Sequence, residues 1–136
     1  MTVIRPRASE VLQHPLFWSS EARLSFLRDT SDRVELEDRE THSDLLEALE
    51  STAPLALGAK WDEKLDPAFI TNIGQYRRYK YDSVRDLLRV MRNKLNHYRE
   101  LPKEIQVSLY LHACSFPPFS FLFFGVRDWV CGAFSW

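Results

Sequence analysis

Residues 83–99 carry one apolar stripe that constrains the fold more than any other part of the sequence. Its apolar residues follow one another at three- and four-residue steps, which places their side chains on one face of an α-helix. The stripe consists of Val84, Leu87, Leu88, Met91, Leu95 and Tyr98. Ser83 before it is a good helix N-cap, and Asp86 three residues later resembles the acidic member of a capping box. A long amphipathic helix must therefore lie against a core that the rest of the chain supplies.

Shorter helical patterns flank this segment, and no convincing alternating strand precedes Val107. Residues 5–18 predict a short helix with Ser9 as its N-cap, and residues 20–33 predict a second helix capped by Ser19 or Ser20. We therefore expect an all-α fold, a small helical bundle with an irregular aromatic C-terminal tail.

Further start and stop signals lie on either side of the loop predicted for residues 55–61. Thr41 or Ser43 caps a helix whose inward positions are Leu45, Leu46 and Leu49. Asp66 followed by Pro67 begins the next helix, which Gly74 ends as its C′ residue. After the stripe, Pro102 opens a short last helix over residues 103–106.

Charge is distributed unevenly along the chain of 136 residues, although the net charge is only -1. Residues 77–103 contain nine Lys and Arg against three Asp and Glu, and residues 35–50 contain seven Asp and Glu against one Arg. A local basic face can attract a phosphate backbone even when the whole protein is nearly neutral. Two ordinary solvated helix faces would give the same pattern, so both interpretations stay open.

Residues 107–136 are aromatic and nearly uncharged. The stretch 105–126 lacks charged residues and has the length of a membrane span, but Pro117 and Pro118 would break a helix there. We predict no membrane span. Cys114 and Cys131 form no metal-binding spacing and fit a reducing compartment, and the N-terminus does not resemble a signal peptide.

The polar face of the 83–99 helix carries the most suggestive chemistry. Asn93 and His97 lie one turn apart there, Arg89 and Arg92 flank them, and Tyr79 precedes the helix. A cation, an amide, an imidazole and a phenol can together hold and cleave an RNA phosphodiester without a metal. His97 suits the general acid, Arg92 and Asn93 suit the phosphate, and Tyr79 suits a base or a group that orients the 2′-OH. DNA lacks that hydroxyl and would not be cut.

The spacing alone favours a plainer interpretation, with a surface histidine among arginines and a tyrosine packed on a helix. The sequence contains no HExxH motif, Gly-rich phosphate loop, GxSxG or Cys/His pair. We therefore predict no metal and no cofactor.

The stretch from Tyr79 to Pro102 resembles the kinase-extension nuclease domain of the inositol-requiring enzyme family, with ribonuclease L as a more distant relative. The residues that carry the resemblance are YKYDSVRDLLRVMRNKLNHYRELP, and their character is that of a plant member. RPRASEVLQHPLFW resembles the last helix of a protein-kinase C-lobe, which precedes that domain in the family. The resemblance covers residues 5–106. It divides the chain into a kinase remnant at 1–18, a nuclease domain at 19–106 and a divergent tail at 107–136.

This resemblance implies an endoribonuclease with His97 and Tyr79 as catalytic residues. Arg92 and Asn93 would bind the phosphate, with Arg89 and Arg78 as further RNA-binding cations. The family cleaves an RNA stem-loop during mRNA splicing and decay in the unfolded protein response, and it acts as a back-to-back homodimer. The expected location is cytoplasmic, since the family faces the cytosol from the endoplasmic reticulum membrane.

The chain departs from the family beyond Gln106, where a closing helix is expected and VSLYLHACSF stands instead. That difference favours a truncated form, and an alternative function is a non-catalytic module that dimerises or binds full-length family members. Kinase activity is excluded for this segment because no catalytic-loop or metal-binding aspartate motif is present.

Overall fold

The structure, a computed structural model, describes residues 5–37 and 43–115. Within these ranges the chain is helical and contains no strand, which confirms the predicted all-α class. Seven α-helices follow one another: α1 (Ala8–Leu12), α2 (Ser20–Glu37), α3 (Asp44–Ser51), α4 (Ala53–Leu57), α5 (Pro67–Gly74), α6 (Val84–His97) and α7 (Lys103–Ser115). Short 3-10 turns occupy Pro15–Phe17, Trp61–Lys64 and Tyr98–Glu100.

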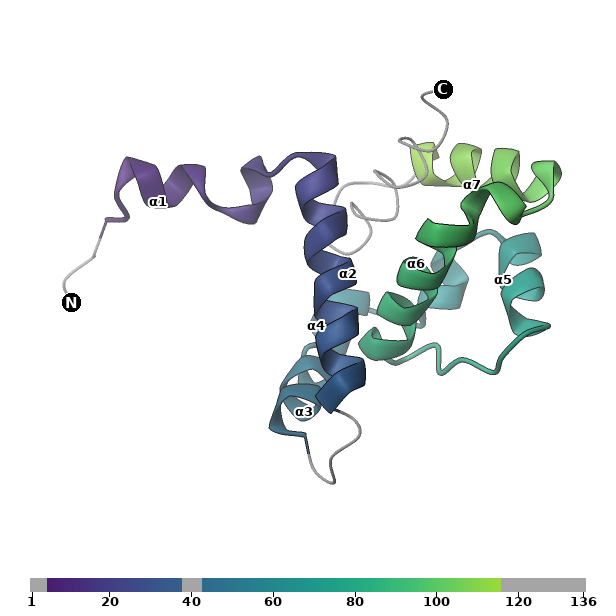
Figure 1. Cartoon of the computed structure of the whole chain (residues 1–136), viewed down its shortest axis with the longest axis horizontal. Helices are drawn as coiled ribbons and strands as arrows, with labels where there is room; N and C mark the ends of the chain where they lie inside the picture. The colour runs from purple at the N-terminus through teal and green to yellow at the C-terminus, as the bar shows by residue number, and fades with distance from the viewer. Residues whose placement is uncertain (1–4, 38–42, 116–136) are drawn as a thin grey trace.

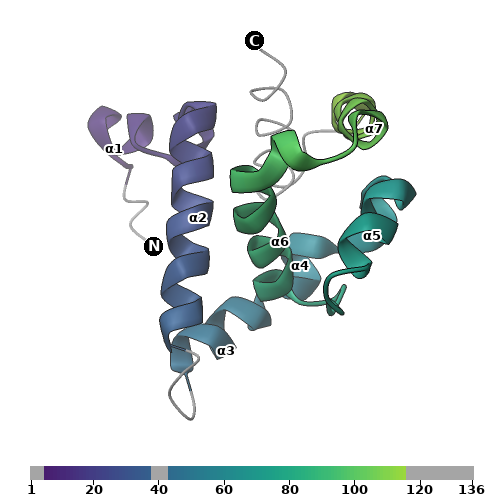
Figure 2. The ribbon, with the colours of Figure 1, turned by 45° about the vertical axis from the view of Figure 1, so that its right-hand side comes forward.

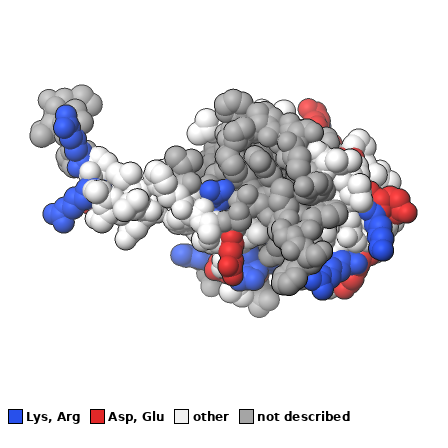
Figure 3. Space-filling model, turned by 90° about the horizontal axis from the view of Figure 1, so that it is seen from above, with Lys and Arg blue, Asp and Glu red and all other residues white. Residues whose placement is uncertain are grey.

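Helix α6 lies at the centre of the bundle. Helix α2 runs beside it in the opposite direction, and α3 packs across their shared end (Figures 1 and 2). Helices α5 and α7 contact each other on the other side of α6. Helix α1 stands apart from this bundle and extends away from it as an arm (Figures 1 and 3).

The predicted stripe forms the centre of the core. Val84, Leu87, Leu88, Met91 and Tyr98 are all buried. Val90, which the stripe did not include, is also buried because a second layer of side chains covers α6 on that flank. The largest buried side chains outside α6 are Trp61, Phe69, Leu57 and Ile73. Burying each such side chain contributes about 1.5–3 kcal/mol to stability. Because the core forms around the apolar face of α6, the other helices are assembled on this helix.

Three of the predicted helix starts are confirmed. Ser43 Oγ accepts from Leu46 N at 3.2 Å, and Asp66 Oδ1 accepts from Ala68 N at 2.8 Å. Ser83 Oγ accepts from Asp86 N at 3.1 Å, which is the predicted cap of α6. These caps satisfy backbone N–H groups that have no partner within the helix.

The reciprocal half of the predicted capping box is absent at α6. The carboxylate of Asp86 accepts instead from Lys80 N at 2.7 Å, outside the helix. Glu50 of α3 takes over the cap: its carboxylate accepts from Val84 N at 3.2 Å and from Arg85 N at 3.0 Å. Ser83 Oγ also donates to Glu50 at 2.6 Å. A residue distant in the sequence therefore anchors the start of the central helix.

Several predicted boundaries were wrong. Ser9 lies inside α1, whose N-cap is Arg7, and α2 continues four residues beyond the predicted end at Arg33. Residues Ala53–Leu57 form α4 where a loop was predicted, and the chain turns at Gly58 with a φ of 68°. Gly74 belongs to α5 itself, because the helix is capped by Gln75.

The last helix is longer than predicted. Helix α7 extends from Lys103 to Ser115, and Leu109 is buried against the core. The helix thus crosses the expected boundary between residues 106 and 107, since the first residues of the supposed tail still supply an apolar face. The aromatic remainder of that tail, residues 116–136, lies outside the described residues. Among the helices that the structure describes, none is both long and apolar enough to cross a membrane.

Candidate active site

The loop that carries Tyr79 joins α5 to α6 and is fixed on the core by Trp61. The fully buried indole donates from Nε1 to the Lys80 carbonyl at 3.2 Å, and Trp61 N donates to the Tyr81 carbonyl at 2.9 Å. Its ring meets Tyr79 and Tyr81 edge to face, with centroids 6.2 Å and 4.8 Å apart. The position of the Tyr79 phenol is therefore set by packing on a rigid residue.

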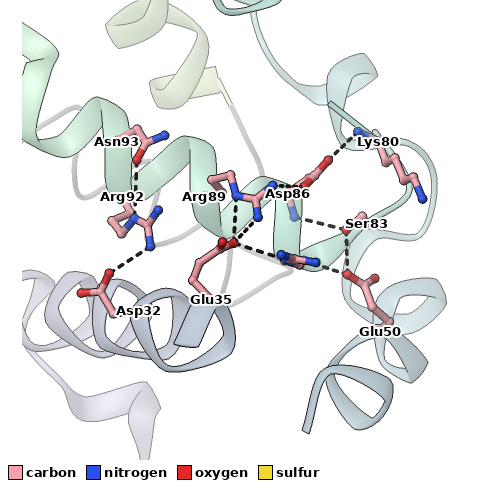
Figure 4. Close-up of polar contacts among 10 residues, drawn as sticks. Asp32, Glu35, Glu50, Lys80, Ser83, Asp86, Arg89, Arg92 and Asn93 are labelled. Carbon is pink, nitrogen blue, oxygen red and sulfur yellow. Dashed lines mark hydrogen bonds and ion pairs between the residues drawn. The ribbon is translucent and has the colours of Figure 1, made fainter. Parts of the chain in front are cut away.

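A line of buried charges ties the same loop to α6 and α2 (Figure 4). Asp86 accepts from Lys80 N through Oδ2 and from Arg89 Nη1 through Oδ1, the latter at 3.1 Å. Arg89 Nε in turn donates to Glu35 Oε1 of α2 at 2.8 Å. Two carboxylates thus hold one guanidinium, and the line connects the Tyr79 loop to the opposite helix.

Arg89 does not lie on an exposed basic face, contrary to the sequence-based expectation. Only 6% of the residue is exposed, and its guanidinium is engaged by Glu35 and Asp86. The reason is the close packing of α2 on α6, which covers the flank of the helix that periodicity alone assigned to solvent. A cation held in this way is placed to support the fold.

Arg92 is oriented from both sides. Its Nη1 donates to Asp32 Oδ1 of α2 at 3.0 Å, and its Nε lies 3.5 Å from Asn93 Oδ1 (Figure 4). The guanidinium carries five N–H donors, so these two contacts leave others for an anion. The contact to the amide oxygen of Asn93 also turns the amide N–H₂ of that residue away from Arg92.

Tyr79 and Asn93 meet through their side chains. Burial raises the pKa of the half-buried Tyr79 phenol above its ordinary value of 10.0. The charge of Arg77 and a side-chain hydrogen bond with Asn93 act in the opposite direction without cancelling the effect. The phenol is consequently protonated at neutral pH, where it can donate and accept hydrogen bonds.

His97 lies at the end of α6 with 59% of its side chain exposed. Its Nδ1 is 2.9 Å from Glu100 Oε1, a carboxylate on the 3-10 turn that follows the helix. When Nδ1–H donates to that carboxylate, Nε2 is the ring nitrogen that can face a substrate. The predicted imidazole is therefore accessible and has an orienting partner.

A hollow of about 600 Å³ opens between α5, the end of α6 and the turn after it. Asn93 and His97 both line it, together with Asn72, Tyr76, Lys94 and Glu100. Sequence reasoning did not single out Asn72, Tyr76 or Glu100. The nearest sequence signal was that Tyr76 is an aromatic residue three positions before Tyr79. The periodicity of α6 did not show that α5 would face this helix.

A second hollow, of about 640 Å³, lies along the start of the Tyr79 loop and α6. Arg77, Arg78 and Lys80 line it with Glu50 and Asp82. Tyr79 lies in the sequence between Arg78 and Lys80, which both line this second hollow. The structure brings Asn93 and His97 together in the first hollow, with Tyr79 and Arg92 each beside Asn93, whereas Arg78 lines the second hollow.

The acidic and basic segments pair with each other, so the molecule is less polarised than their separation in sequence suggested. Glu35 contacts Arg85 and Arg89, and Asp32 contacts Arg92. Seen from above, both signs of charge mix along the rim of the body (Figure 3). In residues 5–37 and 43–115, no group of three His, Cys, Asp or Glu side chains is arranged to hold a metal ion.

Residues 23–121 match the family described as Ribonuclease 2-5A. The chain belongs to this family. The chain is 76% identical over 103 residues to the Arabidopsis thaliana serine/threonine-protein kinase/endoribonuclease IRE1a, and 50% identical over 102 residues to rice IRE1. It is 42% identical over 102 residues to a Schizosaccharomyces pombe protein named as a sensor for unfolded proteins in the ER. The predicted resemblance to the kinase-extension nuclease domain of a plant member is confirmed.

The match to these Ribonuclease 2-5A relatives covers about three quarters of this chain, namely 76%, 75% and 75%. The same alignments span only 12%, 11% and 10% of the relatives' own lengths. The chain therefore corresponds to a small part of each relative, and the matched family range includes all the residues that line the two hollows.

Proposed function

We propose that this domain is an endoribonuclease that cleaves RNA by attack of the ribose 2′-OH on the adjacent phosphate, without a metal ion. The observation that supports this most is a series of neighbours among three functional groups, two of which line one hollow. The Tyr79 phenol bonds to Asn93, and Asn93 shares the hollow with His97 one helical turn away. Phenol, amide and imidazole are thereby within reach of one phosphodiester.

Tyr79 orients the nucleophile. Because burial raises its pKa, the phenol is neutral at pH 7 and is a poor general base. A neutral phenol can still accept a hydrogen bond from the 2′-OH and align that oxygen with phosphorus. The 2′-oxygen–phosphorus bond then forms while the hydroxyl proton passes to solvent.

Asn93 and Arg92 hold the phosphate. The Asn93 amide and the remaining N–H groups of Arg92 are donors that can contact the non-bridging oxygens. Asp32 and Asn93 Oδ1 hold the guanidinium in place before substrate arrives. Preorganised donors of this kind stabilise charge that develops in the transition state.

His97 completes the reaction as general acid. Its Nε2–H protonates the departing 5′-oxygen as the phosphorus–oxygen bond breaks, and Glu100 holds the opposite nitrogen. The products are a 2′,3′-cyclic phosphate and a 5′-OH. Arg89 supports the Tyr79 loop in this scheme, and Arg78 contacts the RNA backbone in the second hollow.

The partners we propose are an RNA stem-loop and a second copy of the chain, with full-length family members as further dimerisation partners. The proposed setting is mRNA splicing and decay in the unfolded protein response, at the cytosolic face of the endoplasmic reticulum. Support comes from the endoribonuclease and sensor names of the relatives.

The test is cleavage of a stem-loop RNA by the purified chain in EDTA, with His97→Ala and His14→Ala compared at equal concentration. Wild type and His14→Ala should cut equally, because His14 is an exposed residue outside both hollows, and His97→Ala should be inactive. Equal cutting by wild type and His97→Ala, or loss of all cutting in EDTA, would refute the proposal.

A non-catalytic interaction module is the second candidate function, and the arm formed by α1 favours it. Helix α1 projects from the bundle (Figure 1). Its last residue, Leu12, is 70% exposed, and Phe17 in the 3-10 turn that follows is 57% exposed. Exposed apolar side chains on such an arm suit contact with another protein. Self-association in sedimentation experiments, without RNA cleavage, would favour this function.

A further inference from the structure

The hollow beside His97 contains an aromatic surface that the cleavage reaction does not use. Tyr76 is 77% exposed, which is unusual for so large a side chain. Lys94 Nζ lies 5.2 Å from the centroid of its ring. Lys94 also lines the hollow, and burial lowers the pKa of its amine. A cation is attracted to one face of the phenol ring, and the remaining exposure leaves ring surface for a ligand.

Amide groups lie at the same hollow. Among the described residues, Asn72 Oδ1 is buried without a hydrogen-bond partner although Asn72 lines the hollow. Leaving a buried acceptor without a partner is unfavourable, so a ligand that donates to it is favoured. Gln75 adds a second amide at this site. Amide side chains match the donor and acceptor edges of nucleobases.

The positions of the catalytic groups indicate on which side of the cleaved phosphate, upstream or downstream, the hollow lies. The 2′-OH belongs to the nucleotide upstream of the cleaved phosphate, and we placed it at Tyr79. The leaving 5′-oxygen belongs to the downstream nucleotide, and we placed it at His97. His97 lines the hollow that contains Tyr76, whereas Arg78 and Lys80, the sequence neighbours of Tyr79, line the basic hollow.

We infer that the hollow at Tyr76 binds the base of the nucleotide immediately 3′ to the cleaved phosphate, with Tyr76 as its stacking surface. This inference rests on the proposed function for its direction along the strand. Stacking on an aromatic side chain tolerates all four bases, while the Asn72 and Gln75 amides favour bases that present a matching edge. The upstream RNA backbone occupies the basic hollow.

The experiment uses the full chain and stem-loop RNAs in which 2-aminopurine replaces one loop base at a time. A 2′-deoxy substitution blocks the cut in these probes, and the cut itself is mapped with the unmodified RNA. Fluorescence quenching on binding is compared for wild type, Tyr76→Phe, Tyr76→Ala and a control, Phe17→Ala. The control removes an exposed aromatic residue in the 3-10 turn Pro15–Phe17 that lines neither hollow.

Quenching of the probe directly 3′ to the cut should be retained in Tyr76→Phe and Phe17→Ala and lost in Tyr76→Ala. Tyr76→Ala should also weaken RNA binding about 5- to 150-fold, the range for loss of one stacked base. If the Tyr76-dependent probe lies 5′ to the cut, the direction is wrong. If no probe depends on Tyr76, the base site itself is refuted. If the wild type does not cut, the proposed function and the direction that rests on it are both refuted, while the Tyr76 dependence of quenching, which is read without cleavage, still decides the base site.

Discussion

Replacing Arg89 with methionine should destabilise the domain severely while leaving its surface unchanged. Arg89 is 6% exposed and Asp86 is 9% exposed. Methionine fills similar space but removes the cation, so the Asp86 carboxylate would stay buried with only the Lys80 N–H to compensate its charge. Glu35 keeps its contact with Arg85 and loses less.

Breaking a buried ion pair from one side costs about 3–5 kcal/mol. Small domains have total stabilities of about 5–15 kcal/mol, so this loss is a large share. At about 4 °C per kcal/mol, the melting temperature should fall by about 12–20 °C. Thermal and urea unfolding followed by circular dichroism at 222 nm measure both quantities.

Two further variants make this test specific. Arg33→Met removes an exposed arginine that pairs with Glu37 on the same helix α2, and it should change stability by less than about 1 kcal/mol. Asp86→Asn combined with Arg89→Met removes the orphaned charge but keeps an acceptor for Lys80 N, so the double variant should be more stable than Arg89→Met alone. The reasoning fails if Arg89→Met unfolds within about 1 kcal/mol of wild type, or if the double variant is less stable than Arg89→Met.

The remaining predictions concern pH, a turn and the phenol. Burial raises the pKa of Glu35, but hydrogen bonds and charges from Arg85 and Arg89 bring it below its ordinary 4.5. The folded chain therefore binds fewer protons at Glu35 than the unfolded chain does. Stability should fall as the pH drops below about 4.5, and it should fall less steeply in Glu35→Gln. Gly58→Ala should cost about 1–2 kcal/mol of stability because the backbone φ at Gly58 is 68°. Gly74→Ala should be neutral or stabilising, because Gly74 is helical and an added Cβ would meet open space. Equal effects of the two substitutions on the urea midpoint would contradict this prediction. Asn93→Leu should raise the pKa of the Tyr79 phenol further. The change should appear as an alkaline shift of the Tyr79 signal in the ultraviolet titration, and Tyr79→Phe identifies that signal. An unchanged titration would exclude the hydrogen bond between Asn93 and Tyr79.

Local sequence signals predicted the parts of this fold that depend on neighbouring residues. All members of the α6 stripe except Leu95, whose side chain lies outside the described part of the structure, are buried as their spacing indicated. The Ser43, Asp66 and Ser83 caps form as predicted. Each of these features involves residues within about one helical turn, so periodicity and capping chemistry are sufficient to find them.

Features that depend on contacts between distant segments could not be predicted in this way. Glu50 caps α6 from 33 or more positions away, and the burial of Arg89 needs Glu35 of another helix. The same limit applies to the candidate site. Spacing placed Asn93 and His97 on one face, but the hydrogen bond to Tyr79 and the presence of Tyr76 and Asn72 in the hollow depend on how α5 packs.

The most direct test of the proposed chemistry is a single 2′-deoxy substitution at the nucleotide 5′ to the mapped cut in a stem-loop RNA. Our account predicts that this change alone abolishes cleavage, while the same substitution one nucleotide further 3′ leaves the rate within a few fold. The unmodified RNA should yield a 2′,3′-cyclic phosphate. Continued cleavage of the RNA that lacks the 2′-OH would contradict the account, because no nucleophile would then be left for Tyr79 to orient.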